Sequence, residues 1–191
     1  MPSISLTNPL NITELRFNSI STQKLGGTIE SLDAFPNLEE FYIIDHELTG
    51  SIPDISGNTN IGNLHCQKNQ LTGNIPGLSS KTALVGFKCH DNSLTGNIPN
   101  LSSNTNLTQF HCFNNNLTGY AGGSVSSTLL SFLAFNNNLS ISAVNSILAA
   151  FVAAGASGGT LNLAGTNAAP TGQGITDKAT LSSRGWTVVT S

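Results

Sequence analysis

Residues 84–102 read LVGFKCHDNSLTGNIPNLS, and this stretch recurs along the chain with little change. The triplet Leu-Thr-Gly begins at Leu48, Leu71, Leu94 and Leu117, so successive copies are evenly spaced along the chain. A fixed period of roughly 20–50 residues is typical of a stack of similar units, each of which contacts only its neighbours. The sequence therefore predicts a solenoid rather than a globular domain with one central core.

The apolar residues of the repeat have the spacing L-x-x-F-x-C-x-x-N-x-L, which resembles the leucine-rich-repeat consensus. The half that follows, L-T-G-N-I-P, is similar to the plant-type subclass found in receptor-kinase ectodomains and polygalacturonase-inhibiting proteins. The resemblance covers residues 12–140, although each repeat is one residue shorter than the usual plant-type length. It implies an α/β solenoid, a horseshoe with a parallel β-sheet on its concave face and irregular or 3-10 return segments.

Each repeat is expected to begin with a short strand whose alternate side chains point into the stack. No single coil can bury its own apolar face, so parallel stacking of the strands must bury one column of side chains at each inward position. The expected core positions are Leu38, Phe41, Ile43, Ile61, Leu64, Cys66, Leu84, Phe87, Cys89, Leu107, Phe110 and Cys112.

One polar position repeats together with the apolar ones, at the point where the chain leaves each strand. It holds Asn69, Asn92, Asn115 and Asn137. An inward amide at this place can hydrogen-bond to backbone groups of the adjoining coils. We interpret these four residues as a structural ladder and not as a catalytic set.

The repeats and the departures from them divide a single continuous domain into three parts. Residues 1–24 are expected to form an amino-terminal capping coil, and residues 25–139 the regular 23-residue repeats. Residues 140–191 depart from the pattern and are expected to form helix-bearing repeats and a carboxy-terminal cap.

Two helices are expected in this last part. The apolar residues after residue 139 fall at helical spacing, with Ser140 as the N-cap and Gly155 as the residue that stops the helix. A second helix is expected over residues 177–184, capped by Thr176, before a last strand that begins at Trp186. Trp186 is interpreted as a core or cap residue.

The cysteines Cys66, Cys89 and Cys112 occupy the same inward position in three successive coils. Side chains of parallel in-register strands point the same way, which does not suit the geometry of a disulfide. A metal site is the sharper alternative, but a column of thiols without convergent further ligands is poor zinc geometry. We therefore expect three buried free thiols, no metal and no cofactor.

The outward positions of the same strands predict a binding surface on the concave face. Their side chains are less repetitive than the rest of each coil, and curved solenoids commonly bind partners through such a face. The alternative is that they are ordinary solvated strand residues. The candidate binding residues are Glu40, Tyr42, Asn63, His65, Gln67, Lys88, His90, Gln109, His111 and Phe113, with Arg16 in the same column as Tyr42.

Composition disfavours several classes of function. Only 9% of the residues are charged and the formal net charge is -3, so no basic surface for nucleic acid is expected. No run of apolar residues is long enough for insertion into a membrane. Nucleophile-elbow, zinc-protease and phosphate-loop motifs are absent from the sequence, which disfavours an enzyme and leaves catalysis as a remote alternative.

A non-enzymatic binding or structural role remains. The first residues lack the basic and apolar segments of a signal peptide, which predicts synthesis in the cytoplasm. Together with low charge and free thiols, this favours a virion surface component, such as a head decoration, fibre or adhesin, whose partner is a capsid or other virion protein. The alternative is a secreted or cell-surface recognition module that binds a protein or a surface glycan.

Overall fold

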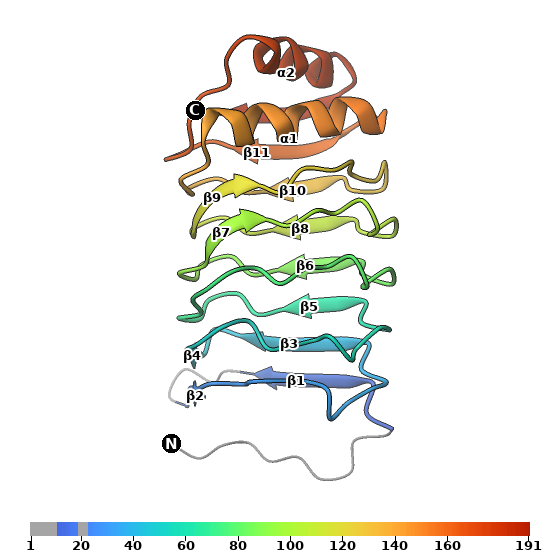
Figure 1. Ribbon diagram of the computed structural model, residues 1–191, viewed down its shortest axis with the longest axis vertical. Coiled ribbons are helices and arrows are strands. Elements are labelled where there is room, and N and C mark those ends of the chain that lie inside the picture. The colour runs from blue at the N-terminus through green and yellow to red at the C-terminus, as the bar shows by residue number, and fades with distance from the viewer. Residues whose placement is uncertain (1–10, 19–22) are drawn as a thin grey trace.

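The computed structural model describes residues 11–18 and 23–191. Figure 1 shows a stack of coils along one long axis, with the amino-terminal coils at one end and both helices at the other. This is the predicted leucine-rich-repeat solenoid. Much of the predicted capping coil, and the region used to judge a signal peptide, lie outside the described residues.

Within the described residues the main sheet has eight strands, in the order β1-β3-β5-β6-β8-β10-β11-β12. Neighbouring strands pair in parallel and in register along the stack. The strands are β1 (Glu14–Asn18), β3 (Glu40–Ile44), β5 (Asn63–His65), β6 (Gly86–Lys88), β8 (Gln109–His111), β10 (Ser131–Leu133), β11 (Gly159–Leu163) and β12 (Trp186–Thr190).

Shorter strands form where the chain turns away from the main sheet. Strand β2 (Gly26–Gly27) pairs with β4 (Glu47–Leu48), and β7 (Thr95–Ile98) pairs with β9 (Asn116–Tyr120). The rest of the return path in the regular repeats consists of turns without a helix. The return segments are therefore irregular, as the resemblance implied.

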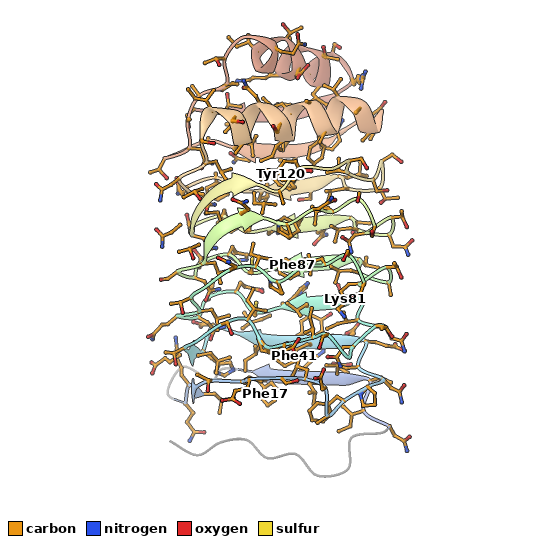
Figure 2. All side chains as sticks on the ribbon, viewed as in Figure 1. Phe17, Phe41, Lys81, Phe87 and Tyr120 are labelled. Atoms are coloured by element: carbon orange, nitrogen blue, oxygen red, sulfur yellow. The ribbon has the colours of Figure 1, made fainter. Side chains whose placement is uncertain are left out.

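The inward columns form the core. The twelve predicted core side chains are all fully buried. Phe87 stacks on Phe110 with ring centroids 5.2 Å apart, and Phe110 stacks on Phe132 at 5.5 Å. Figure 2 shows Phe41 and Phe87 one above the other along the stack. Each coil is thus stabilised by apolar contact with the coils before and after it.

The asparagine column binds neighbouring coils through backbone groups. Asn92 donates from Nδ2 to the carbonyl of Cys66, one coil back, at 3.1 Å, and accepts from the backbone N–H of Leu71 at 2.9 Å. Asn69, Asn115 and Asn137 repeat this arrangement. Each of these asparagines therefore hydrogen-bonds the end of its strand to the coil before it.

The structure extends this column at both ends. His46 lies one repeat before Asn69; its Nδ1 accepts the N–H of Leu25, and its Nε2 lies 3.1 Å from the carbonyl of Phe17. Asn167 repeats the amide arrangement after the first helix. Sequence spacing identifies His46 only if an imidazole is allowed at the position, and it misses Asn167 because the helix lengthens that repeat.

A second buried polar column, which the repeat pattern did not predict, lies on the return side at Asn58, Lys81 and Asn104. Asn58 and Asn104 donate to carbonyls of the preceding coil. Lys81, marked in Figure 2, takes the middle position and donates from Nζ to the Ser56 carbonyl at 3.1 Å. Its side chain is almost fully buried, and burial lowers its pKa.

The first helix has the predicted bounds. Helix α1 (Ile141–Ala154) begins after Ser140, whose hydroxyl accepts the N–H of Ala143, and ends at Gly155 in the left-handed region. Neither described helix is long and apolar enough to cross a membrane.

The second helix begins earlier than predicted. Helix α2 (Gln173–Ser183) starts after Gly172, so Thr176 lies inside the helix and is not its cap. Asn145 of α1 both donates to the carbonyl and accepts the N–H of Thr171, which fixes the chain just before α2. A tertiary contact, and not a local capping side chain, therefore determines where α2 begins.

Candidate functional site

The concave face of the main sheet carries the candidate residues in register. The central column runs Arg16, Tyr42, His65, Lys88 and His111 along β1, β3, β5, β6 and β8, and it continues with Leu133 on β10. Glu40, Asn63 and Gln109 align on one side of it, and Gly86 falls between Asn63 and Gln109. The face thus places different side chains at equivalent positions of otherwise similar coils.

At the amino-terminal end the charged groups of this face are paired. The Arg16 guanidinium lies 3.7 Å from the centre of the Tyr42 ring and donates to Glu40 at 2.8 Å, and it also contacts Glu14. Tyr42 packs edge-on against His65, with ring centroids 4.7 Å apart. This cluster is held together by interactions within the protein.

In the middle of the face Lys88 lies between His65 and His111 on the neighbouring strands. Burial, and after it the charge of Lys88, lowers the pKa of each imidazole to about 4, so both are neutral near pH 7. His111 Nε2 lies 2.8 Å from the Ser131 hydroxyl. The buried His65 Nε2 has no hydrogen-bond partner within the described part of the chain.

Toward the carboxy-terminal end the face becomes aromatic. His90 stacks on Phe113 with ring centroids 4.1 Å apart, and Phe113 stacks on Phe135 at 4.4 Å. His90 is also held by Asp91, whose carboxylate lies 2.7 Å from Nδ1. Phe135 was not among the predicted residues, although it stands two residues before Asn137, as Phe113 stands two residues before Asn115. The asparagine column therefore gives its position in the sequence.

The ten candidates differ in accessibility. Gln67 is only 9% exposed, and its Oε1 is buried without a partner in the described chain, so it is the least accessible of them. Gln109 is exposed, and the others are partly exposed. The surface that a partner can reach is therefore the central column, the aromatic stack, and Glu40, Asn63 and Gln109 beside the column.

The cysteine column lies behind this face. Cys66, Cys89 and Cys112 are free thiols with no exposed surface. Burial raises the pKa of Cys66 to about 12 and that of Cys89 and Cys112 well above the ordinary value. The described residues contain no group of three or more His, Cys, Asp or Glu side chains placed to hold a metal ion.

Comparison with family models and with curated proteins found no match. Among solved structures the chain is similar to the ectodomain of the plant receptor kinase GASSHO1/SCHENGEN3 from Arabidopsis thaliana, in complex with CASPARIAN STRIP INTEGRITY FACTOR 2. That similarity has 26% identity and a TM-score of 0.67, over 87% of this chain and 20% of the receptor chain.

Two further solved structures are similar over a shorter part of the chain. The Arabidopsis receptor kinase HAESA, in complex with an N-terminal extended IDA peptide hormone ligand, matches with 28% identity and a TM-score of 0.51, over 61% of this chain and 21% of that one. PEPR1-AtPEP1 matches with 25% identity and a TM-score of 0.54, over 61% and 17%. The chain thus spans about a fifth of the length of each of these three chains.

Proposed function

We propose that this leucine-rich-repeat protein, which resembles the plant type, is a recognition module whose concave sheet face binds an extended segment of a protein or peptide. One observation carries the proposal. Equivalent positions of the central column hold Tyr42, His65, Lys88 and His111, whereas the core and ladder positions of the same coils repeat almost unchanged. Packing explains the repeated positions but gives no reason for variety on the outward ones.

The similar structures support this choice of partner. Two of the receptors described above were solved with a peptide hormone or a named factor bound. They are ectodomains, so we also propose an extracellular or cell-surface location and a role without catalysis. These comparisons favour the recognition module over the virion surface component suggested by composition, and a protein partner over a glycan.

The test is a selection of binders from a displayed library of random nonapeptides against the purified chain. Selected peptides should bind about 5- to 150-fold more weakly to the Tyr42→Ala and His111→Ala variants, because loss of one central contact costs about 1–3 kcal/mol. Thr59→Ala and Ser79→Ala are matched controls, since both residues are exposed on the return side of the coils.

Three outcomes would contradict the proposal. The concave variants could bind as well as the wild type while Thr59→Ala or Ser79→Ala lose the peptides. Random peptides could fail to yield binders while a glycan array yields them. Finally, the native chain could sediment at fixed stoichiometry with virus particles, which would restore the virion component as the leading hypothesis.

A further inference from the structure

Lys88 is an uncompensated positive charge at the centre of the concave face. Arg16 is paired with Glu14 and Glu40 at the amino-terminal end of this face, and His90, two residues after Lys88 in the same coil, is held by Asp91. Lys88 has no carboxylate within salt-bridge distance, 4.0 Å, among residues 11–18 and 23–191. The protein has a net negative charge, yet none of its described carboxylates pairs with the Lys88 ammonium.

The groups around Lys88 are polar but neutral. His65 and His111 flank it in register on the neighbouring strands, each roughly 4.8 Å away in backbone spacing. Both imidazoles are neutral near pH 7, since burial and the charge of Lys88 disfavour their protonation. One unpaired ammonium among neutral hydrogen-bonding rings is complementary to a single carboxylate.

The face becomes apolar two strands beyond Lys88. Leu133 follows Lys88 and His111 in the central column, and Phe135 lies two residues after Leu133 at the end of the aromatic stack. Both side chains are partly exposed. Two strand spacings separate Lys88 from Leu133, which is about 10 Å.

This separation matches one conformation of an extended peptide. A polyproline II segment rises about 3.1 Å per residue with three residues per turn, so residues i and i+3 lie on the same side and about 9 Å apart. In a β-strand the residues i and i+3 lie on opposite sides. A polyproline II segment that crosses the strands can therefore place one side chain over Lys88 and another over Leu133.

We propose that Lys88 is the anion-binding position of the concave face. The ligand, on this proposal, is an extended peptide that places an acidic side chain against Lys88 and an apolar side chain, three residues away, against Leu133 and Phe135. This inference rests on the proposed function and specifies its ligand class. The acidic group belongs to a side chain rather than a chain end, because the face continues on both sides of Lys88 and gives the peptide room in both directions.

The first test needs no peptide ligand. The imidazole NMR signals of His65, His90 and His111 are followed at pH 7 while N-acetyl-glutamate N-methylamide is added, with the glutamine analogue as the uncharged control. The acidic probe should give saturable shifts that the glutamine analogue does not give. The shifts should disappear in Lys88→Met and persist in Lys68→Met, which removes an exposed lysine from a nearby turn.

Three results would overturn the anion position: no saturable shift with the wild type, shifts that survive Lys88→Met, or equal shifts with both probes. A third probe, N-acetylalanine, carries its carboxylate at a chain end. If it binds while the glutamate probe does not, the side-chain assignment is wrong.

The second test uses the peptides selected in the display experiment. They should share an acidic residue three positions from Leu, Ile, Met or Phe, and a change of this spacing to two or four should weaken binding at least tenfold. Lys88→Glu should shift the preference at the acidic position to Lys or Arg. Binders without this pattern would refute the inference and leave the proposed function standing. Binding that the concave variants leave unchanged would refute the proposed function, and the peptide class assigned here would fall with it.

Discussion

Substitution of Asn115 by alanine tests whether the asparagine column holds the coils together. Asn115 is 7% exposed; its Oδ1 accepts the N–H of Leu94 at 2.9 Å. Its Nδ2 lies 3.1 Å from the carbonyls of Cys89 and Cys112, and 3.2 Å from that of Phe113. Asn115→Ala removes these hydrogen bonds together and leaves buried backbone groups of two coils without this partner.

The magnitude follows from these contacts. A buried polar group left without a partner costs about 1–3 kcal/mol, and the Leu94 N–H loses its acceptor. The three carbonyls each keep a second donor, so each of them loses one of two hydrogen bonds. The unpaired N–H together with the lost Nδ2 hydrogen bonds should lower the free energy of unfolding by about 2–4 kcal/mol, a substantial part of the roughly 5–15 kcal/mol that stabilises a typical domain. The adjacent Asn116 is exposed and its side chain has no hydrogen bond within the described residues, so Asn116→Ala should change it by less than about 0.5 kcal/mol.

The assay is urea unfolding of both variants and the wild type, followed by circular dichroism, together with amide hydrogen exchange at Leu94. Exchange at Leu94 should become much faster in Asn115→Ala than in Asn116→Ala, because Leu94 N–H loses its acceptor. If the two variants unfold within about 1 kcal/mol of each other, the ladder does not hold the coils together.

Three further perturbations have defined outcomes. The pKa of His65 and His111 is about 4 when folded and about 6.5 when unfolded, so the unfolded chain binds more protons between these values and stability should fall as pH drops through this window. After allowance for solvent screening we expect the two histidines together to lower the free energy of unfolding by roughly 2–4 kcal/mol. Replacing both histidines by Gln should reduce the dependence of the urea midpoint on pH, and an unchanged dependence would contradict this prediction. Gly159→Ala should lower the free energy of unfolding by about 2–4 kcal/mol, measured by thermal or urea unfolding. The φ of Gly159 is +121°, and a Cβ there would lie 2.5 Å from the Leu130 carbonyl and 2.8 Å from the Trp186 ring. Gly77→Ala is the control, because the space around Gly77 is open. The buried cysteine column should react with Ellman's reagent only at the rate of unfolding, and rapid labelling of the native chain would show that the column is accessible.

Some features of the concave face follow from the repeat spacing, and others depend on side-chain packing. The register of Tyr42, His65 and Lys88 follows from the repeat, because in-register parallel strands align equivalent positions. The low exposure of Gln67 does not follow from the repeat, because it depends on how neighbouring side chains pack over it. The position of Phe135 can be read from the sequence, two residues before Asn137, but its stacking on Phe113 is seen only in the folded chain.

The helical end shows a second limit. The hydroxyl of Ser140 and the left-handed backbone of Gly155 are local signals, and both bounds of α1 follow from them. The start of α2 has no such signal, since Gly172 gives no side-chain cap and the chain before it is held by Asn145 of α1. A contact between residues 26 apart is invisible to an argument from local sequence.

The amino-acid pattern alone is enough to specify the solenoid, the parallel sheet, the buried apolar columns and the residues of the concave face. All of these follow from the repeat that the regular coils share, which each of them carries in its own local sequence. Knowing which charges on that face are satisfied requires the folded chain. Arg16 reaches Glu40 across 24 residues of sequence, while Lys88 meets neutral histidines and no described carboxylate. Whether a charge is paired depends on which side chains of neighbouring coils come within contact distance. A repeat pattern aligns positions along the stack, but it does not specify these contacts.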